Sequence, residues 1–147
     1  TGKGEGEGFT VNLPMPAGAG DLEHLDAMDR NSEPVREQLD PGLLSSSGGQ
    51  DGHAGDQLAG QMLTATGFNE LASRRAGFAR RNGIGLVALH EGGYNLDTLP
   101  RLDHAILAGF GGFETDLTEP VEVPRTDVGW EARLDEIKRA QANYWEL

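Results

Sequence analysis

Cysteine is absent from this sequence of 147 residues, so neither disulfide bonds nor thiolate metal sites can form. The same absence leaves the redox compartment undecided. Basic residues are scarce, because 12 Lys and Arg stand against 24 Asp and Glu, for a formal net charge of −12. This balance argues against a nucleic-acid-binding surface, which needs a basic patch, and it is compatible with a cationic substrate.

Long hydrophobic runs are absent as well. The longest, Ile84–Leu89, is far shorter than a membrane span, and the N-terminus lacks the charged-then-apolar pattern of a signal peptide. We therefore expect a soluble, cytoplasmic protein that does not act at a membrane. Glycine, by contrast, occupies 22 positions, which indicates many loops, and the length suits one domain over residues 1–147.

Apolar patterns predict strands over residues 9–13, 43–47 and 84–89. The third run, IGLVAL, is continuously apolar, as is typical of a parallel strand covered on both faces. Helices are predicted from Asp21 as N-cap, with a break or restart at Pro34, and over residues 64–82, 96–108 and 130–144. Residues 109–124 are expected to be mostly irregular. Strands that alternate with helices indicate the α/β class with a mostly parallel sheet.

The segment Leu43–Gly60 combines a short apolar run, two glycines and then acids with a histidine. Asp51 and His53 form an Asp-x-His pair, and a carboxylate with an imidazole is a reasonable beginning for a zinc site. Such residues at a strand end fit the place where open α/β sheets carry their sites. The alternative is a polar loop whose Asp and Gly residues only make turns.

A second strand end carries Glu91-Gly92-Gly93-Tyr94. The two glycines would let backbone approach a ligand closely, and the Tyr94 hydroxyl could donate a hydrogen bond to a developing oxyanion. The alternative is a tyrosine ring packed on the sheet with its hydroxyl in water. A metal-type acid at one strand end and an oxyanion donor at the other would suit metal-assisted hydrolysis of an acyl bond.

Four segments carry a family resemblance: GEGEGFTVNLPMPAGAGD (4–21), LLSSSGGQDGHAGDQLAGQMLTATGF (43–68), LVALHEGGYN (86–95) and QANYWEL (141–147). Together they resemble the zinc-dependent histone deacetylase family, including its bacterial acetylpolyamine-amidohydrolase-like members. The resemblance implies the arginase/deacetylase fold, a three-layer αβα domain with a mostly parallel sheet. It also implies that Asp51 is a zinc-binding aspartate, that Tyr94 polarises the acetyl carbonyl with zinc, and that Gly92 and Gly93 lie beside the substrate tunnel. It places His53 at a non-ligand loop position, which weakens its claim as a ligand.

The sequence also departs from that family. Family members are about twice as long, and their first half supplies a His-His pair and an earlier Asp-x-His pair that this sequence lacks. The chain therefore resembles the carboxyl-terminal half of the domain. Ser45–Ser47 stand where the family strand is more apolar, which should weaken the strand, and Gln57 stands where proline is common.

These observations predict part of a zinc-dependent deacetylase that acts on acetyl-lysine or acetylpolyamine. The missing groups would come from a complementing N-terminal half, or the chain would form a homo-oligomer. By itself the chain should bind zinc weakly or not at all and lack deacetylase activity. Two alternatives remain: a non-catalytic binding or assembly module that keeps the fold, and a truncated fragment without a function of its own.

Overall fold

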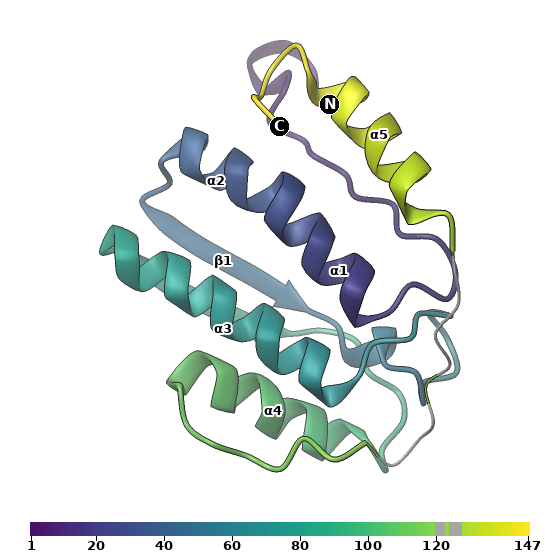
Figure 1. Cartoon of the computed structure of the whole chain (residues 1–147). Coiled ribbons are helices and arrows are strands. Elements are labelled where there is room, and N and C mark those ends of the chain that lie inside the picture. Colours follow the sequence, from purple (N-terminus) through teal and green to yellow (C-terminus); the bar gives the residue numbers. More distant parts are fainter. Residues whose placement is uncertain (120–122, 124–127) are drawn as a thin grey trace.

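Two parallel strands and the helices packed against them organise the computed structural model, which describes all residues except 120–122 and 124–127 (Figure 1). In chain order the elements are the 3₁₀ turn Gly4–Gly6, α1 (Asp21–Ala27), the π-helical turn Met28–Ser32, α2 (Glu33–Leu39), β1 (Leu43–Gly48), the 3₁₀ turn Gln50–Gly52, α3 (Ala65–Asn82), β2 (Gly85–His90), α4 (Leu99–Gly111) and α5 (Trp130–Gln141). Within the described ranges, none of the helices has the length and apolar character that crossing a membrane requires.

The sheet is parallel, as predicted, and α3 is its crossover connection. Ser45 pairs with Val87 and Gly48 with His90, so the ladder with β2 continues through the serine run of β1. Parallel neighbours need such a long connection, which is usually helical. Thr64 caps the start of α3 by accepting a hydrogen bond from the Gly67 N–H, and α3 ends at Asn82 as predicted.

Two hydrophobic clusters make up much of the interior of the described residues. The first joins the α1–α2 region, α3 and α4, and the second joins α1 to α5. Their buried members are Met28, Leu63, Ala65, Phe68, Leu71, Leu102 and Ala105 in the first cluster, and Ala27, Trp130, Leu134 and Ile137 in the second. Helix α5 thus packs against Ala27 of α1 and against Leu13 and Met15 of the N-terminal segment.

The two ends of the chain meet beside α5 (Figure 1). The Tyr144 hydroxyl donates a hydrogen bond of 2.7 Å to Glu7, and the Trp145 indole N–H donates one of 2.8 Å to the Gly8 carbonyl. The Phe9 ring meets the Trp145 ring edge-on, with 5.8 Å between centroids. The N-terminal segment therefore takes its order from residues at the far end of the sequence.

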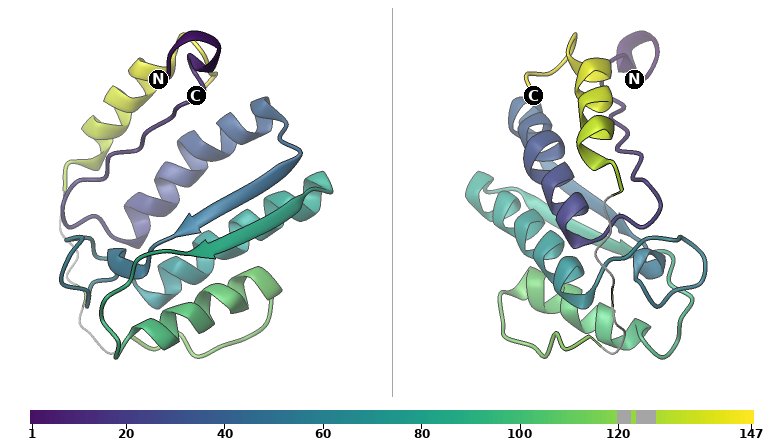
Figure 2. Two further views of the ribbon diagram at one scale, coloured as in Figure 1. Left: turned by 180° about the vertical axis from the view of Figure 1, so that it is seen from behind. Right: turned by 45° about the vertical axis from the view of Figure 1, so that its right-hand side comes forward.

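One face of the sheet is uncovered by the described residues. Seen from behind, the strands lie in front of α3, and no helix crosses their outward face (Figure 2). On β2, Val87 is 48% and Leu89 is 51% exposed, and Leu43 on β1 is 56% exposed. The prediction that residues 84–89 are covered on both faces is therefore wrong for the described chain, because the described helices cover only one face. The fold class itself is α/β with a parallel sheet, as expected.

Three details of the predicted elements differ in the structure, and a fourth, the restart at Pro34, is confirmed. Residues 9–13 form no strand, because Phe9 and Leu13 pack toward Trp145 and the α5 cluster and not toward a neighbouring strand. Gly20, not Asp21, is the N-cap of α1, and the Asp21 carboxylate instead accepts hydrogen bonds from Thr64. The restart at Pro34 is confirmed, since α2 begins at Glu33 after the π-helical turn. The irregular segment predicted for 109–124 starts after α4 ends at Gly111, and its last part lies outside the described residues.

Candidate functional site

The loops that follow β1 and β2 are joined by backbone hydrogen bonds at the carboxyl ends of the strands. The Glu91 N–H donates to the Gly48 carbonyl at 2.9 Å, and the Gln50 N–H donates to the Gly92 carbonyl at 2.8 Å. These bonds continue the hydrogen bonding between β1 and β2 into the loops that follow them. As a result the Asp51 loop and the Tyr94 loop lie at the same edge of the sheet, which is where open α/β sheets place their sites.

Asp51 lies in the 3₁₀ turn Gln50–Gly52, between two glycines that leave room for its carboxylate. An added Cβ at Gly49 would lie 2.5 Å from Asp51 Oδ1, and one at Gly92 would lie 3.0 Å from the same oxygen. Both glycines are therefore required by close approach to this side chain. No hydrogen bond to the Asp51 carboxylate occurs within the described part of the chain, so its oxygens are free to bind another group.

Tyr94 follows Gly93, whose φ of +135° is a conformation that glycine adopts without strain. A Cβ on Gly93 would also lie 2.8 Å from Leu99 Cδ1 and 3.1 Å from Gln50 Cβ. The Tyr94 side chain is 54% exposed, and its hydroxyl has no hydrogen-bond partner among the described residues. The hydroxyl is thus available to a ligand that approaches from solvent.

Asp56 fixes the backbone of the Tyr94 loop. Its carboxylate accepts hydrogen bonds from the backbone N–H groups of Tyr94 at 2.7 Å, Asn95 at 3.1 Å and Leu58 at 3.0 Å. Desolvation alone would raise the pKa of Asp56, but these hydrogen bonds outweigh it and hold the pKa below its usual value. Asp56 therefore ties the end of the Asp51 loop to the first residues after Gly93.

His53 is buried, and both of its ring nitrogens form hydrogen bonds. Its Nδ1 accepts a hydrogen bond from the Gly55 N–H at 3.0 Å, so Nε2 carries the proton and donates to Glu119 Oε1 at 3.0 Å. The other Glu119 oxygen accepts from the Ala65 N–H at the start of α3. Both ring nitrogens are thus occupied, and His53 is not among the ligands we propose below.

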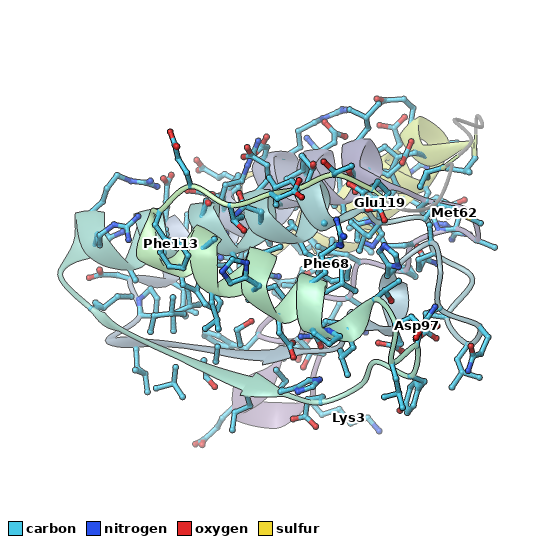
Figure 3. The ribbon with its side chains drawn as sticks, turned by 90° about the horizontal axis from the view of Figure 1, so that it is seen from below. Lys3, Met62, Phe68, Asp97, Phe113 and Glu119 are labelled. Atoms are coloured by element: carbon cyan, nitrogen blue, oxygen red, sulfur yellow. The ribbon has the colours of Figure 1, made fainter. Side chains whose placement is uncertain are left out.

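Asp56 is one of the acids that follow the first apolar run, but its role in fixing the Tyr94 loop was not predicted, and Glu119 was not predicted at all. Asp56 accepts a hydrogen bond from the N–H of Leu58, two residues later. Such a local turn is the one Asp56 contact that a sequence pattern can indicate. Glu119 reaches His53 across 66 residues, which no local pattern reveals. Figure 3 shows Glu119, Met62 and Asp97 at the end toward which the strands point, and Phe113 at the opposite end of the molecule.

Zinc needs three protein ligands and an open position in a catalytic site. Across the described ranges, no group of three His, Cys, Asp or Glu side chains is placed to hold a metal ion. Asp51 offers one free carboxylate, and His53 is already bonded on both sides. The described residues therefore do not fit a complete zinc site and supply at most one of its ligands.

Comparison with known proteins gives one family throughout. The family model described as "Histone deacetylase domain" matches residues 1–110. A "Probable deacetylase" of Archaeoglobus fulgidus is 33% identical over 99% of this chain and 44% of its own length. A "Histone deacetylase-like amidohydrolase" of Pseudomonas aeruginosa is 31% identical over 82% of this chain and 32% of its own length.

Solved structures agree with this assignment. The structure of the histone deacetylase Clr3 superposes with a TM-score of 0.83 at 29% identity, over 99% of this chain and 24% of Clr3. The HD domain of HDA15 superposes with a TM-score of 0.81 at 25% identity, over 98% of this chain and 37% of that domain's chain. The chain thus spans less than half the length of each of these relatives.

Proposed function

The chain belongs to the histone deacetylase family, and from that premise we propose that it contributes part of the active site of a zinc-dependent amide hydrolase. Its substrate would be an acetylated amine, either acetyl-lysine or an acetylpolyamine. The observation that carries this proposal is the joining of the Asp51 loop and the Tyr94 loop at one edge of the sheet. The net charge of −12 is compatible with a substrate that is cationic.

Each residue of this edge has a role in the proposal. Asp51 would be one metal ligand, since its carboxylate oxygens have no other partner in the described chain. The Tyr94 hydroxyl would donate a hydrogen bond to the oxyanion that forms when the acetyl carbonyl is attacked. Gly92 and Gly93 would leave space for the acetyl group. Zinc, when bound, would supply Lewis-acid activation of the carbonyl and of water.

The remaining groups would come from a complementing N-terminal half of the domain. Two observations support this proposal: the chain spans 44% of its Archaeoglobus relative, and one face of the sheet is bare of described residues. Such a partner would provide the other metal ligands and the histidines that transfer protons. We derive no metal-dependent step for this chain alone, because Asp51 is a single ligand.

A non-catalytic binding or assembly module is the second candidate. It is favoured by the lack of a three-ligand group in the described chain and by Ser45–Ser47 in β1. In that case the open sheet face would bind a partner or a second copy of the chain, and Asp51 and Tyr94 would have no catalytic role.

Reconstitution distinguishes the two candidates. The chain is mixed with the part of the Archaeoglobus fulgidus relative that lies outside the match, and zinc-dependent hydrolysis of an acetyl-lysine peptide and of acetylspermidine is measured. We expect turnover by the mixture and none by either part alone, with Asp51→Ala as the inactive control. A stable complex without turnover would favour the binding module. Turnover by the chain alone that Asp51→Ala abolishes would contradict the half-site proposal.

A further inference from the structure

A cavity of about 600 Å³ lies between the sheet and the helices α1, α3 and α4. Small side chains leave this space open on the strand side, where Ser46 and Ala88 line it, and Ala72 does the same on α3. Leu71, Leu107 and Phe110 form much of its apolar wall. The cavity therefore offers room and apolar surface for a ligand that carries a hydrocarbon chain.

Arg75 of α3 lines this cavity without a counter-charge. Its neighbour Arg74 does not line the cavity and forms an ion pair with Asp29. Arg75 is partly buried, and no hydrogen bond or ion pair reaches its guanidinium from the described residues. Because an arginine side chain keeps its charge and carries five N–H donors, this is a desolvated cation with unused donors.

The electrostatic surroundings make this isolation stronger. The charged residue that acts on Arg75 is another cation, Arg36, which is itself paired with Glu33 (Nη2 to Oε2, 3.5 Å) and offers Arg75 no counter-charge. His24 also lines the cavity, but burial lowers its pKa and its Nδ1 is hydrogen-bonded to the Gly20 carbonyl, so it adds no positive charge at neutral pH. Asp103, on the α4 side, already accepts a hydrogen bond of 2.7 Å from Gln50.

We propose that this cavity is a binding site for a monocarboxylate with an unbranched apolar chain. The carboxylate would accept charge-assisted hydrogen bonds from Arg75 and one from the Ser46 hydroxyl, which has no partner among the described residues. The hydrocarbon chain would lie against Leu71, Leu107 and Phe110. Asp51 also lines the cavity, but the site uses neither its carboxylate nor zinc nor Tyr94, so octanoate binding can be tested separately from the deacetylase proposal.

Octanoate is the probe for this site, with octanamide as a neutral ligand of the same chain length. Both are titrated into the ¹⁵N-labelled full chain at neutral pH, and amide shifts of the cavity residues Ser46, Ala88 and Phe110 are followed. We expect saturable shifts there and an affinity for octanoate at least about tenfold higher than for octanamide, because a hydrogen bond to a charged group contributes that much. Equal affinities for the two ligands would overturn the proposal.

Arg75→Met should weaken octanoate binding by at least about tenfold and leave octanamide binding unchanged. Arg74→Met is the matched control, because it removes the adjacent cation that does not line the cavity, and it should leave both affinities unchanged. An Arg75→Met chain that binds octanoate as before would refute the site, as would shifts confined to Leu43 and Val87, which do not line the cavity. If Arg75→Met does not fold, the affinities of the unchanged chain for octanoate and octanamide test the proposal by themselves.

Discussion

Replacing Gly92 by alanine tests how closely the Asp51 carboxylate is packed at the strand ends. The new Cβ would lie 3.0 Å from Asp51 Oδ1 and 3.2 Å from its Cγ, where ordinary contacts begin at 3.4 Å. The φ of Gly92 is not in the left-handed region, so alanine can adopt this backbone conformation without strain. The loss of stability should therefore come from the contact with Asp51 alone. Forcing extra atoms into a packed site costs about 1–3 kcal/mol. Because Asp51 can give way by a few tenths of an ångström, we expect the lower end, about 1 kcal/mol.

The free energy of unfolding in urea measures this cost, with Gly42→Ala as the matched control. A Cβ at Gly42 would meet no atom within 4 Å, and its φ is also outside the left-handed region. Both substitutions reduce the entropy of the unfolded chain by a similar amount, about 0.4–1 kcal/mol, so the difference between them isolates the contact. Gly92→Ala should be less stable than Gly42→Ala by about 1 kcal/mol.

A double-mutant cycle then assigns the cost to Asp51. If the clash is with its carboxylate, Asp51→Ala should remove most of the penalty of Gly92→Ala, giving a coupling of about 1 kcal/mol. Gly49→Ala, with a contact of 2.5 Å to the same oxygen, should be destabilised more than Gly92→Ala and be rescued in the same way. Equal stabilities of Gly92→Ala and Gly42→Ala, or strictly additive effects in the cycle, would refute the packing argument.

Three further predictions concern single residues of the same edge. In the reconstituted two-part protein, Asp51→Asn should weaken zinc binding, because it removes a charged ligand and keeps the shape; an unchanged affinity by competition titration would exclude Asp51 as a ligand. Tyr94→Phe should leave zinc binding and folding intact and lower turnover by roughly 10²–10³-fold, the usual effect of losing one oxyanion donor. Full turnover by this variant would show that the Tyr94 hydroxyl does not stabilise the oxyanion. The pKa of Asp56 is lower in the folded chain than in the unfolded one, so its stabilising contribution is present above the unfolded pKa and is lost as the pH falls through the folded pKa. Asp56→Asn should flatten that part of a plot of melting temperature against pH, and an unaltered plot would show that its hydrogen bonds do not contribute.

Patterns confined to neighbouring residues predicted the central part of the fold. The periodicity of residues 64–82, the Asn82-Gly83 stop and the two apolar runs gave β1, α3 and β2 within one or two residues, and their order gave the parallel connection. These elements are set by local spacing and by one long apolar helix face. Residues 9–13 have a strand pattern too, but no neighbouring strand is available among the described residues, and their apolar side chains pack on α5 instead.

The candidate site was predictable only where its residues follow a strand directly. Asp51 and Tyr94 come soon after β1 and β2, and the parallel sheet brings both loops to one edge. The partners that fix these loops come from farther along the chain. Glu119 binds His53 over 66 residues and Asp103 binds Gln50 over 53 residues. Because such pairs depend on tertiary packing, the occupation of both His53 nitrogens could not be derived from the Asp-x-His spacing.

The meeting of the two chain ends beside α5 has a consequence for the order of folding. The Tyr144–Glu7 and Trp145–Gly8 hydrogen bonds join residues 137 positions apart, whereas α3, α4 and the two strands contact one another over much shorter separations. Closing so large a loop costs more chain entropy and comes late, after the local contacts have formed. During synthesis the segment around Glu7 and Gly8 must wait for Tyr144 and Trp145 to emerge before these hydrogen bonds can form. In the finished protein, α5 and residues 1–9 should open together as one cooperative unit, at lower free energy than the first cluster around α3 and α4.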